Sequence, residues 1–443
     1  MSNAIARISA FVLLFVSVAY ITDVDATGFQ IFDQSGSCTG NLCAGAAAAG
    51  EDASTMQFNS AGLSYIHGNQ IVGALLTFIP SARFSNNGST TVLGSAASGD
   101  NGGGVEPIAI IPNFYVSSDA AGHGITVGFG INSPYGLETS YDGSWVGRYQ
   151  AIDSRLQTLN LLGAVSYRVN DALSVGGGVN FLHADANLSY AIDSWVACAS
   201  GAPLPLCNTL FKGPGNAAVD GLAQLDLKAW GVGYNLGFIW SPLEGTRVGA
   251  AFYSKVDLGL DGAATFNVPP PLVPAFGNTA ATSKLTLPEV ASLSIFSQLN
   301  PHWAVMADVT WTNWSRFNQL HTDFESGIGA VTIPEKWHDS FLYAGGVTYT
   351  FNGTWKLRSG LAYDETPVKT AYRTPALPDA SRIYLGIGVA RRVSAHGVLD
   401  IGYVHEFIDD AKINKVGELD GGRLAGTFKS DPNVLTLQYT HSF

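Results

Sequence analysis

Residues 27–63 read TGFQIFDQSGSCTGNLCAGAAAAGEDASTMQFNSAGL, and this stretch decides how the rest of the chain is interpreted. It is rich in small residues, contains two cysteines and four consecutive alanines, and lacks the apolar–polar alternation of a strand. After Tyr65 the chain reads as strands separated by turns and loops. A compact segment ahead of many strands predicts a plug around which a barrel closes. A disordered N-terminal arm is the alternative.

The start of the chain has the pattern of an export signal. Arg7 supplies positive charge, an apolar run follows at residues 8–21, and Val24 and Ala26 are small residues at the positions that a signal peptidase reads. The apolar run is shorter than the ~20 residues that a spanning helix needs. We therefore expect three parts: an export signal at 1–26, a hatch, or plug, at 27–63, and a barrel at 64–443.

Composition narrows the class of protein. No later segment has a helix-length apolar run, yet only 13% of the residues are charged, against about 25% in soluble domains. Glycine accounts for 51 of the 443 residues, and aromatic residues for 11%. Only helices and closed barrels satisfy all backbone hydrogen bonds in lipid, so these values predict a transmembrane β-barrel. The net charge of -12 argues against nucleic acid as a partner.

The alternation after Tyr65 supports the same fold. In residues 230–240 every second residue is large and apolar. The residues between them are glycine or asparagine, with an isoleucine only at position 239. Tryptophans stand at both ends of this segment, as in the aromatic girdles of membrane barrels, and short turns alternate with long loops along the chain. The sequence predicts an all-β antiparallel transmembrane barrel of about fourteen strands with the hatch in its lumen. The terminal Phe443 resembles the C-terminal signal of bacterial outer-membrane proteins.

Two segments predict side-chain directions. In residues 173–190 the apolar face shifts by one residue after Phe181, which predicts either a bulge or a strand that leaves the bilayer. In residues 248–261, Val256 and Leu258 continue one apolar face. The charged residues expected to line a wet interior are Lys255, Asp257, Asp308, Lys356, Arg358 and Asp364.

Four cysteines in an exported chain predict disulfides, and their local spacing pairs Cys38 with Cys43 and Cys198 with Cys207. Two zinc-type cysteine pairs are the alternative. Because there is no C-x-x-C motif and no histidine at ligand spacing, we expect no metal site.

Six short motifs, taken in order, resemble the FadL-type outer-membrane transporters of long-chain fatty acids and other hydrophobic compounds. The resemblance extends from the expected mature start to the last residue. In the second motif, Ser60 stands where the family usually has proline. The motifs are Thr27-Gly28-Phe29-Gln30, Phe58-Asn59-Ser60-Ala61-Gly62-Leu63, Ser133-Pro134-Tyr135-Gly136-Leu137, Leu285-Thr286-Leu287-Pro288-Glu289, Trp311-Thr312-Asn313-Trp314-Ser315 and Tyr363-Asp364-Glu365-Thr366-Pro367-Val368.

The resemblance implies that ligand is captured outside, moves towards the hatch and leaves sideways through a gap at a kinked third strand. The residues that it assigns to the hatch are Thr27, Asn59, Ser60 and Ala61, and those that it assigns to the lateral opening are Gly130, Pro134, Tyr135 and Gly136. Pro134 donates no backbone hydrogen bond, and glycines permit unusual dihedrals, which supplies a physical reason for the gap. The alternative is that Pro134 simply ends a strand at the outer rim.

The resemblance also implies where a ligand carboxylate would be held. Alignment by motif places Tyr190 and His321 at the positions where fatty-acid transporters carry cations. Neither side chain is a fixed cation at pH 7, so the pocket is expected to favour neutral or aromatic hydrocarbons, with long-chain fatty acids second. Cations from neighbouring segments are the alternative, and the candidates are Arg148, Arg155 and Lys212.

No catalytic residues and no cofactor are predicted, because the sequence contains no G-x-S-x-G, H-E-x-x-H or phosphate-loop motif. The expected location is the bacterial outer membrane, with membrane lipid and lipopolysaccharide as surroundings and a monomer as the working state. A structural or adhesive barrel without transport is the alternative function.

Overall fold

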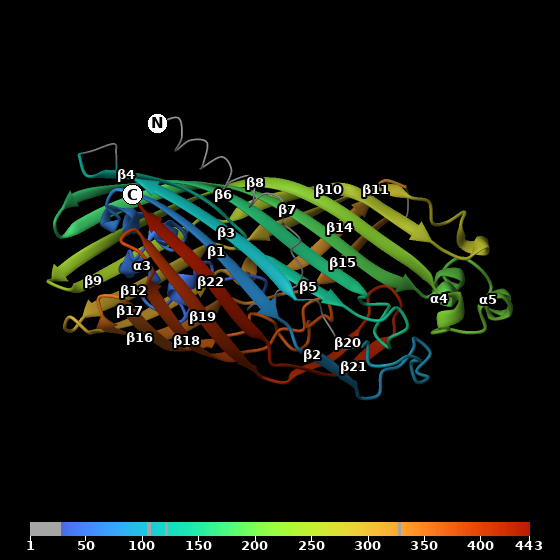
Figure 1. Cartoon of the computed structure of the whole chain (residues 1–443). Coiled ribbons are helices and arrows are strands. Elements are labelled where there is room, and N and C mark those ends of the chain that lie inside the picture. Colours follow the sequence, from blue (N-terminus) through green and yellow to red (C-terminus); the bar gives the residue numbers. More distant parts are fainter. Residues whose placement is uncertain (1–27, 104–107, 120–122, 327–328) are drawn as a thin grey trace.

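The predicted all-β fold is confirmed, and the strands close into a 14-stranded antiparallel barrel (Figure 1). β1 (Asn69–Ile79) pairs with β3 (Ala109–Ser118) on one side and with the C-terminal β22 (Asn433–Ser442) on the other. The first and last strands therefore complete the ring. The computed structural model describes residues 28–103, 108–119, 123–326 and 329–443, so the predicted export signal and Thr27 lie outside the described residues.

Some barrel strands are single elements, and others are broken into two. The single elements are β3, β6 (Asp153–Asn170), β7 (Leu173–Ile192), β8 (Gly221–Leu243), β17 (Trp355–Asp364) and β18 (Arg382–Arg392). The broken strands are β1 with β2 (Ala82–Asn86), β4 (Ile125–Asn132) with β5 (Gly136–Ser140), β9 (Thr246–Tyr253) with β10 (Val256–Asn267), β11 (Thr279–Leu287) with β12 (Val290–Gln298), β13 (Trp303–Thr312) with β14 (Gln319–Phe324), β15 (Gly329–Pro334) with β16 (Ser340–Asn352), β19 (Gly397–Ile408) with β20 (Ala411–Val416), and β21 (Arg423–Ser430) with β22. At the end with the long loops, β2, β20 and β21 form a small separate sheet.

The outer surface of β8 shows where the membrane band begins. Trp230 is 61% exposed, and every second residue from there to Trp240 also faces outward, whereas Asn235 on the opposite face is 1% exposed. Towards the long-loop end the even-numbered residues still face outward, but the chemical character of the two faces is exchanged. There the outward Lys228 is charged and exposed, and the inward Leu227 is apolar and buried. A strand that leaves the bilayer meets water outside, so its apolar side chains turn to the interior. The barrel therefore has a lipid-facing band and, beyond it, an extension with an apolar interior.

The same inversion resolves the phase change in β7. Its pairing with β8 is continuous from Leu173 to Ile192, and its pairing with β6 is continuous from Ser174 to Ser189, so there is no bulge at Phe181. Phe181 faces outward, and Leu182 and Ala184 face inward. The phase change therefore marks the level at which the strand leaves the bilayer.

The prediction for Lys255 and Asp257 is wrong. The barrel strand breaks after Tyr253, and beyond the break Val256 and Leu258 are buried inside while Asp257 is exposed. Lys255 and Asp257 pair with each other on this exposed surface, at 2.7 Å. The reason is again that the strand has left the lipid, so its charged face is the outer one. The other predicted interior charges are largely buried, and two of them, Lys356 and Arg358, bind Glu51 of the hatch.

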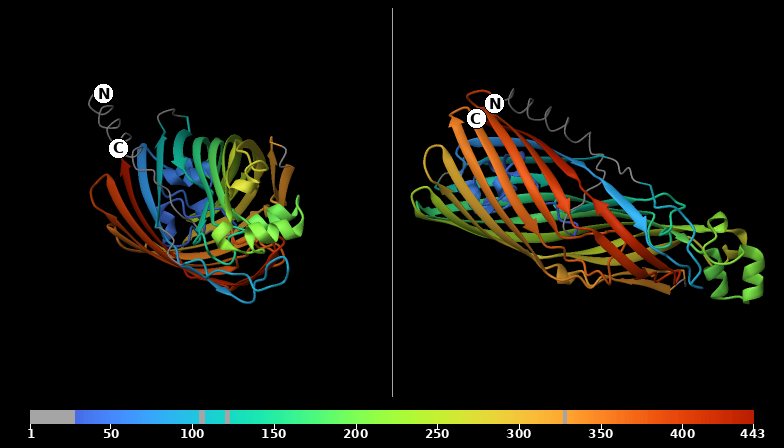
Figure 2. Two further views of the ribbon diagram at one scale, coloured as in Figure 1. Left: turned by 90° about the vertical axis from the view of Figure 1, so that its right-hand side faces the viewer. Right: turned by 90° about the horizontal axis from the view of Figure 1, so that it is seen from below.

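Residues 28–65 lie within the ring of strands, as the view along the barrel shows (Figure 2, blue). Their contacts reach strands on all sides of the ring: α2 contacts β18, β19 and β22, α3 contacts β9 and β12, and η2 contacts β6, β7 and β8. The segment thus fills the lumen, and its last helix ends at Tyr65, slightly beyond the expected boundary. Its short helices are α2 (Gly36–Thr39), α3 (Ala46–Ala49), η1 (Ala53–Gln57) and η2 (Ser60–Tyr65). No helix among the described residues is both long and apolar enough to cross a membrane.

The predicted hatch residues Asn59, Ser60 and Ala61 fix η2 to the wall. The Asn59 side chain accepts a hydrogen bond from the Ala61 N–H at 3.0 Å and donates to the Phe238 carbonyl of β8 at 3.0 Å. Ser60 is the first residue of η2, a position that suits proline, and its hydroxyl donates to Asn235 at 2.5 Å. Ala61 lies against Gly176 of β7, where an added Cβ would come within 2.4 Å of the Ala61 nitrogen.

Both predicted disulfides are present, Cys38–Cys43 and Cys198–Cys207. The second joins α4 (Ser194–Ala199) to α5 (Leu204–Phe211), which project from the long-loop end (Figure 1, right). Other loop helices are η3 (Ala217–Val219), η4 (Pro270–Leu272) and η5 (Trp314–Arg316).

Removing the outer disulfide is expected to loosen only the α4–α5 unit. A loop of this length constrains the unfolded segment by about 2–3 kcal/mol, which is large for a small two-helix unit and small for the barrel. The variant Cys198→Ala/Cys207→Ala should therefore be cleaved faster by protease within residues 194–211, with unchanged heat-modifiable gel migration of the barrel. Equal cleavage rates in the variant and the wild type would contradict this expectation.

Candidate ligand-binding site

The wall of the barrel has a gap between β3 and β5. β3 pairs with β4 from Phe114 to Ser118 only, and β5 pairs with β6 but not with β3. Within the described residues, the stretch 109–113 of β3 has β1 on one side and no strand on the other. The barrel strand that contains β4 and β5 breaks at residues 133–135, and we call the resulting opening the wall gap.

At the kink, residues 134–136 pair with residues 29–31 of the N-terminal segment instead of with β3. The Ile31 N–H donates to the Pro134 carbonyl, and the Gly136 N–H donates to the Phe29 carbonyl, each at 2.9 Å. Gln30 and Tyr135 form an antiparallel bridge between these two bonds. The kink at Pro134 is therefore held inward by the start of the hatch.

Proline contributes on both sides of the wall gap. Pro134 lies at the kink, and Pro112 lies in the stretch 109–113 of β3, which pairs with β1 only. Neither proline can donate a backbone hydrogen bond. Gly130, which the resemblance assigns to the lateral opening, lies in regular β4, where it pairs with Tyr115. An added Cβ at Gly130 would meet the Tyr115 ring at 2.8 Å, so this glycine provides room for packing rather than an unusual dihedral.

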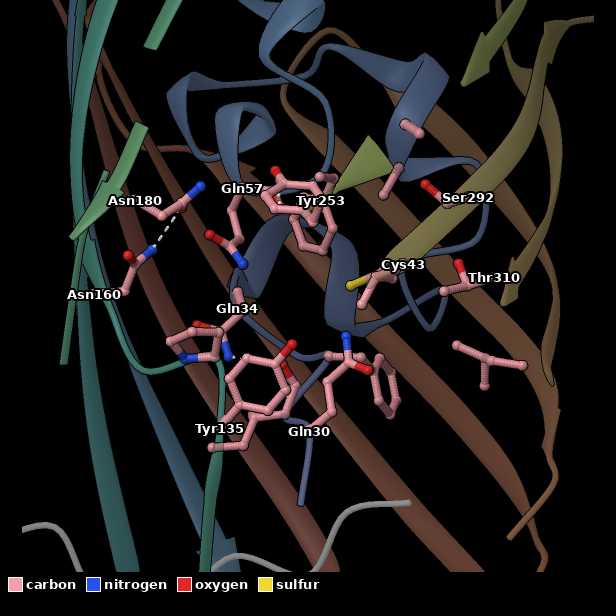
Figure 3. A pocket seen from close by; sticks show the side chains of 18 of the residues that line it. Gln30, Gln34, Cys43, Gln57, Tyr135, Asn160, Asn180, Tyr253, Ser292 and Thr310 are labelled. Atoms are coloured by element: carbon pink, nitrogen blue, oxygen red, sulfur yellow. Dashed lines mark hydrogen bonds between the residues drawn. The ribbon is translucent and has the colours of Figure 1, made fainter. Parts of the chain in front are cut away.

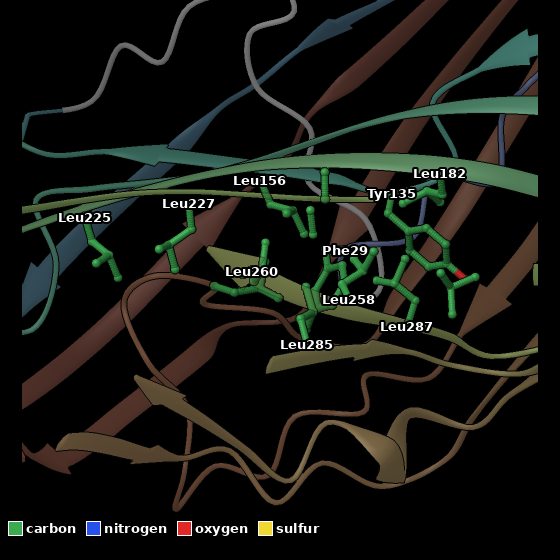
Figure 4. Close-up of a cluster of buried hydrophobic side chains, with 14 of the residues drawn as sticks. Phe29, Tyr135, Leu156, Leu182, Leu225, Leu227, Leu258, Leu260, Leu285 and Leu287 are labelled. Atoms are coloured by element: carbon green, nitrogen blue, oxygen red, sulfur yellow. The ribbon is translucent and has the colours of Figure 1, made fainter. Parts of the chain in front are cut away.

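Apolar side chains fill the interior of the barrel extension down to the wall gap (Figure 4). They come from strands, from the loop after β17 and from the N-terminal segment, and we call them the outer apolar cluster. Its buried members are Phe29, Tyr135, Leu156, Leu182, Ala184, Leu225, Leu227, Ala229, Val256, Leu258, Leu260, Ala264, Ala281, Leu285, Leu287, Trp314, Trp337, Val368 and Leu377.

Phe29 lies at the inner end of this cluster, in contact with four other aromatic rings. Its ring centroid is 4.7 Å from that of Trp314, 5.7 Å from those of Phe317 and Trp337, and 6.1 Å from that of Tyr135. The preceding Gly28 has φ +60°, and a Cβ there would meet Trp314 at 2.7 Å. This approach of the backbone to the indole requires glycine.

Beside Tyr135 a cavity of about 130 Å³ separates the hatch from the wall (Figure 3). It is lined by the kink residues Pro134 and Tyr135, by the hatch and by the strands opposite, and we call it the hatch cavity. Tyr135 thus belongs to the outer apolar cluster, to the hatch cavity and to the wall gap.

Acidic groups flank the outer apolar cluster. Glu335, in the loop before β16, accepts a hydrogen bond from the Trp337 indole at 2.9 Å, and burial raises the pKa of Glu335 to about 7 against the opposing charge of Lys415. The buried Asp379 accepts from the Gly28 N–H at 3.5 Å. Burial raises the pKa of Asp379 as well, against the opposing charge of Arg382. Each acid already faces a cation, so these groups offer a ligand carboxylate no positive charge of their own.

The structure does not bring Tyr190 and His321 together. Tyr190 lies near the outer end of β7, where burial raises the pKa of its hydroxyl. On β14, Thr322 is buried and Phe324 packs against the outer apolar cluster, so His321 lies on the opposite, outward face. There the imidazole lies 3.3 Å from Asp323. The geometry therefore gives no support to a lumenal role for His321.

The other candidate cations are engaged elsewhere. Arg148 is buried between loops, where it binds Asp220 at 2.7 Å and the Ser98 carbonyl at 2.7 Å. Arg155 lies between the inward residues of β6 and contacts Glu138 at 3.8 Å on the outer side. Lys212 is exposed at the end of α5.

A comparison with known families identifies the fold. The family model described as outer membrane protein transport protein (OMPP1/FadL/TodX) matches residues 17–443. The chain belongs to this family. It is accordingly a transport channel of the outer membrane and not an enzyme.

Known relatives cover almost the whole chain. A protein of Escherichia coli O6:H1 named long-chain fatty acid transport protein is 28% identical over 88% of this chain and 90% of its own length. The crystal structure of a Pseudomonas aeruginosa FadL homologue has a TM-score of 0.86 at 22% identity, covering 94% of this chain and 99% of that one. The Pseudomonas putida toluene transporter TodX has a TM-score of 0.67 at 18% identity, covering 94% and 100%. The two solved structures support the fold alone.

Proposed function

We propose that this protein admits hydrophobic compounds passively across the outer membrane. A compound enters the outer apolar cluster from outside, reaches the hatch cavity at Tyr135 and leaves sideways into the membrane through the wall gap. The observation that carries the proposal is the position of Tyr135, which is shared by the cluster, the cavity and the gap. An apolar interior at the extracellular end favours capture, because burial of apolar surface is worth roughly 25 cal/mol per Å².

The preferred substrates are neutral. No lysine or arginine belongs to the described outer apolar cluster. The cations beside it are engaged by acids, because Arg382 pairs with Asp379 and Lys415 pairs with Glu418. Burying a carboxylate without a cation is costly. The hatch cavity, at about 130 Å³, is close in size to cavities of about 150 Å³ that accept benzene. We therefore place neutral aromatic compounds ahead of long-chain fatty acids.

Competition binding at pH 8 with one hydrocarbon and one long-chain fatty acid tests this preference. The hydrocarbon should bind more tightly, and its affinity should not change between pH 6 and pH 8. The affinity of the fatty acid should fall over the same range, because Glu335, with a pKa of about 7, loses its proton and becomes negatively charged as pH rises. Much tighter binding of the fatty acid than of the hydrocarbon at pH 8 would contradict the neutral-substrate proposal.

A structural or adhesive role is the alternative, and one observation favours it. Leu204, Leu206 and Leu210 of α5 are exposed at the tip of the longest outer loop. Hydrophobic compounds recovered by mass spectrometry from gently purified protein would support transport. Protein that carries no such compound and binds a protein receptor through α5 would support adhesion.

A further inference from the structure

The hatch cavity has one side built of amide side chains, which nothing in an apolar transport route requires. Gln30 and Gln57 of the hatch and Asn160 and Asn180 of the wall line it, beside Tyr135 (Figure 3). The direction in which each amide points decides whether the cavity offers hydrogen-bond donors or acceptors.

A chain of hydrogen bonds fixes that direction. The Tyr115 hydroxyl donates to the backbone carbonyl of Gln34 at 3.1 Å. Because the Tyr115 proton is used there, the Asn132 atom 3.3 Å from this hydroxyl must be the nitrogen Nδ2. The same Nδ2 donates to Gln57 Oε1 at 2.5 Å. The other amide atom of Asn132, Oδ1, accepts from Asn160 Nδ2 at 3.0 Å.

At both ends of this series of hydrogen bonds an amide nitrogen has no partner. Asn160 Nδ2 also donates to Asn180 Oδ1 at 3.1 Å, so the remaining group of Asn180 is its N–H₂. Gln57 uses its oxygen, so its remaining group is also N–H₂. Gln30 likewise uses its oxygen, which accepts from Thr312 at 3.2 Å. Within the described residues these three nitrogens and the Tyr135 hydroxyl make no hydrogen bond. Two lining oxygens, Gln34 Oε1 and Asn160 Oδ1, are also unpaired but are fully buried, so the unpaired donors outnumber the unpaired acceptors.

The cavity offers these donors without a cation. Among the described lining residues the one carboxylate is that of Asp308, which accepts hydrogen bonds from Ser294 and Thr310. A ligand carboxylate would lie near this acid with no positive charge to offset it. A neutral oxygen acceptor would satisfy the amide and phenol donors, whereas a pure hydrocarbon would leave them unpaired.

We infer that the hatch cavity holds the acceptor oxygen of a neutral single-ring compound, such as an aromatic aldehyde or ketone. The inference rests on the proposed function and narrows its substrate class. The ring packs on the apolar side of the cavity, formed by residues such as Leu182 and Val256, while the carbonyl oxygen accepts from the Tyr135 hydroxyl and the amides.

The test compares three probes of one size in the purified full-length protein at pH 8: benzaldehyde, styrene and benzoate. Styrene replaces the carbonyl oxygen of benzaldehyde with a CH₂ group, and benzoate adds a negative charge. Benzaldehyde should bind about tenfold more tightly than styrene, the effect of one or two recovered hydrogen bonds. Benzoate should bind most weakly. Equal affinities of benzaldehyde and styrene would overturn the inference, because they would mean that water alone pairs the donors.

Tyr135→Phe removes one donor whose hydroxyl has no partner to lose. It should reduce the preference for benzaldehyde over styrene several-fold, measured as the ratio of the two affinities in the variant and in the wild type. Tyr384→Phe is the matched control, because it deletes a buried hydroxyl 3.4 Å from Asp364 and outside the cavity lining. An unchanged preference in Tyr135→Phe would also overturn the inference. Absence of binding and uptake for both neutral probes would instead contradict the proposed function.

Discussion

Uptake is expected to fall about tenfold or more, equivalent to at least ~1.4 kcal/mol in the barrier, when Pro134 and Gly136 are both replaced by valine. Valine at position 134 restores a backbone donor, and valine at 136 favours a regular extended strand. The upper half of the third barrel strand should then pair with the free side of β3 instead of the Phe29–Ile31 segment. The wall gap closes, and a compound in the hatch cavity loses its exit.

The measurement is uptake of a labelled neutral aromatic compound by cells or vesicles that contain equal amounts of folded protein. Gly259→Val is the matched control, since an added Cβ at Gly259 of β10 meets nothing within 4 Å. The control should transport at the wild-type rate. Wild-type uptake by a correctly assembled double variant would place the exit elsewhere, for example through the hatch to the periplasm.

Arg358→Met is expected to loosen the hatch, because it removes the bridge to Glu51 and leaves the buried carboxylate of Asp400 without its cation, a loss that costs about 3–5 kcal/mol. The Arg358 guanidinium is 2% exposed and binds Glu51 of the hatch at 2.7 Å and Asp400 of the wall at 2.6 Å. Arg358 of β17 therefore connects Glu51 of the hatch with Asp400 of β19. The variant should admit small ions, which single-channel recordings in planar bilayers detect as a raised conductance.

Lys356→Met is the matched control for this experiment. Lys356 also binds Glu51, at 2.5 Å, but its side chain is 43% exposed, and exposed ion pairs contribute only about 0–1 kcal/mol. The conductance of the Lys356→Met variant should stay close to that of the wild type. Equal conductance in Arg358→Met and the wild type would show that the hatch is held by its backbone contacts and amide hydrogen bonds alone.

The sequence predicts the barrel because lipid imposes a strict alternation. Residues 230–240 alternate cleanly, and the structure places them in the lipid-facing band as expected. Beyond the band the alternation continues, but the apolar residues face the interior and the polar residues face water. Alternation alone therefore does not say which face of a strand is inward. For this reason the pattern predicts Lys255 and Asp257 on the inward face, whereas they lie on the outward one. The shift after Phe181 was the available signal, and its meaning depends on the level of the membrane.

The wall gap could be predicted only in part. Pro134 indicates an irregularity, and Pro112 is a second signal, since proline within a strand marks an edge or a bulge. The pairing of Phe29–Ile31 with Pro134–Gly136 joins segments about a hundred residues apart, and no local pattern encodes it. The rings around Phe29 come from Tyr135, Trp314, Phe317 and Trp337, which only the closed barrel brings together.

The most direct test of the transport route is photolabelling with an aryl diazirine, followed by mass spectrometry of the labelled residues. The account predicts labels on inward residues of the outer apolar cluster, such as Leu258, and at Tyr135 beside the wall gap. It predicts none at Phe296 and Arg247, which line a pocket on the periplasmic side of the hatch. Strong labelling of Phe296 and Arg247 would contradict lateral release and show that the ligand passes the hatch.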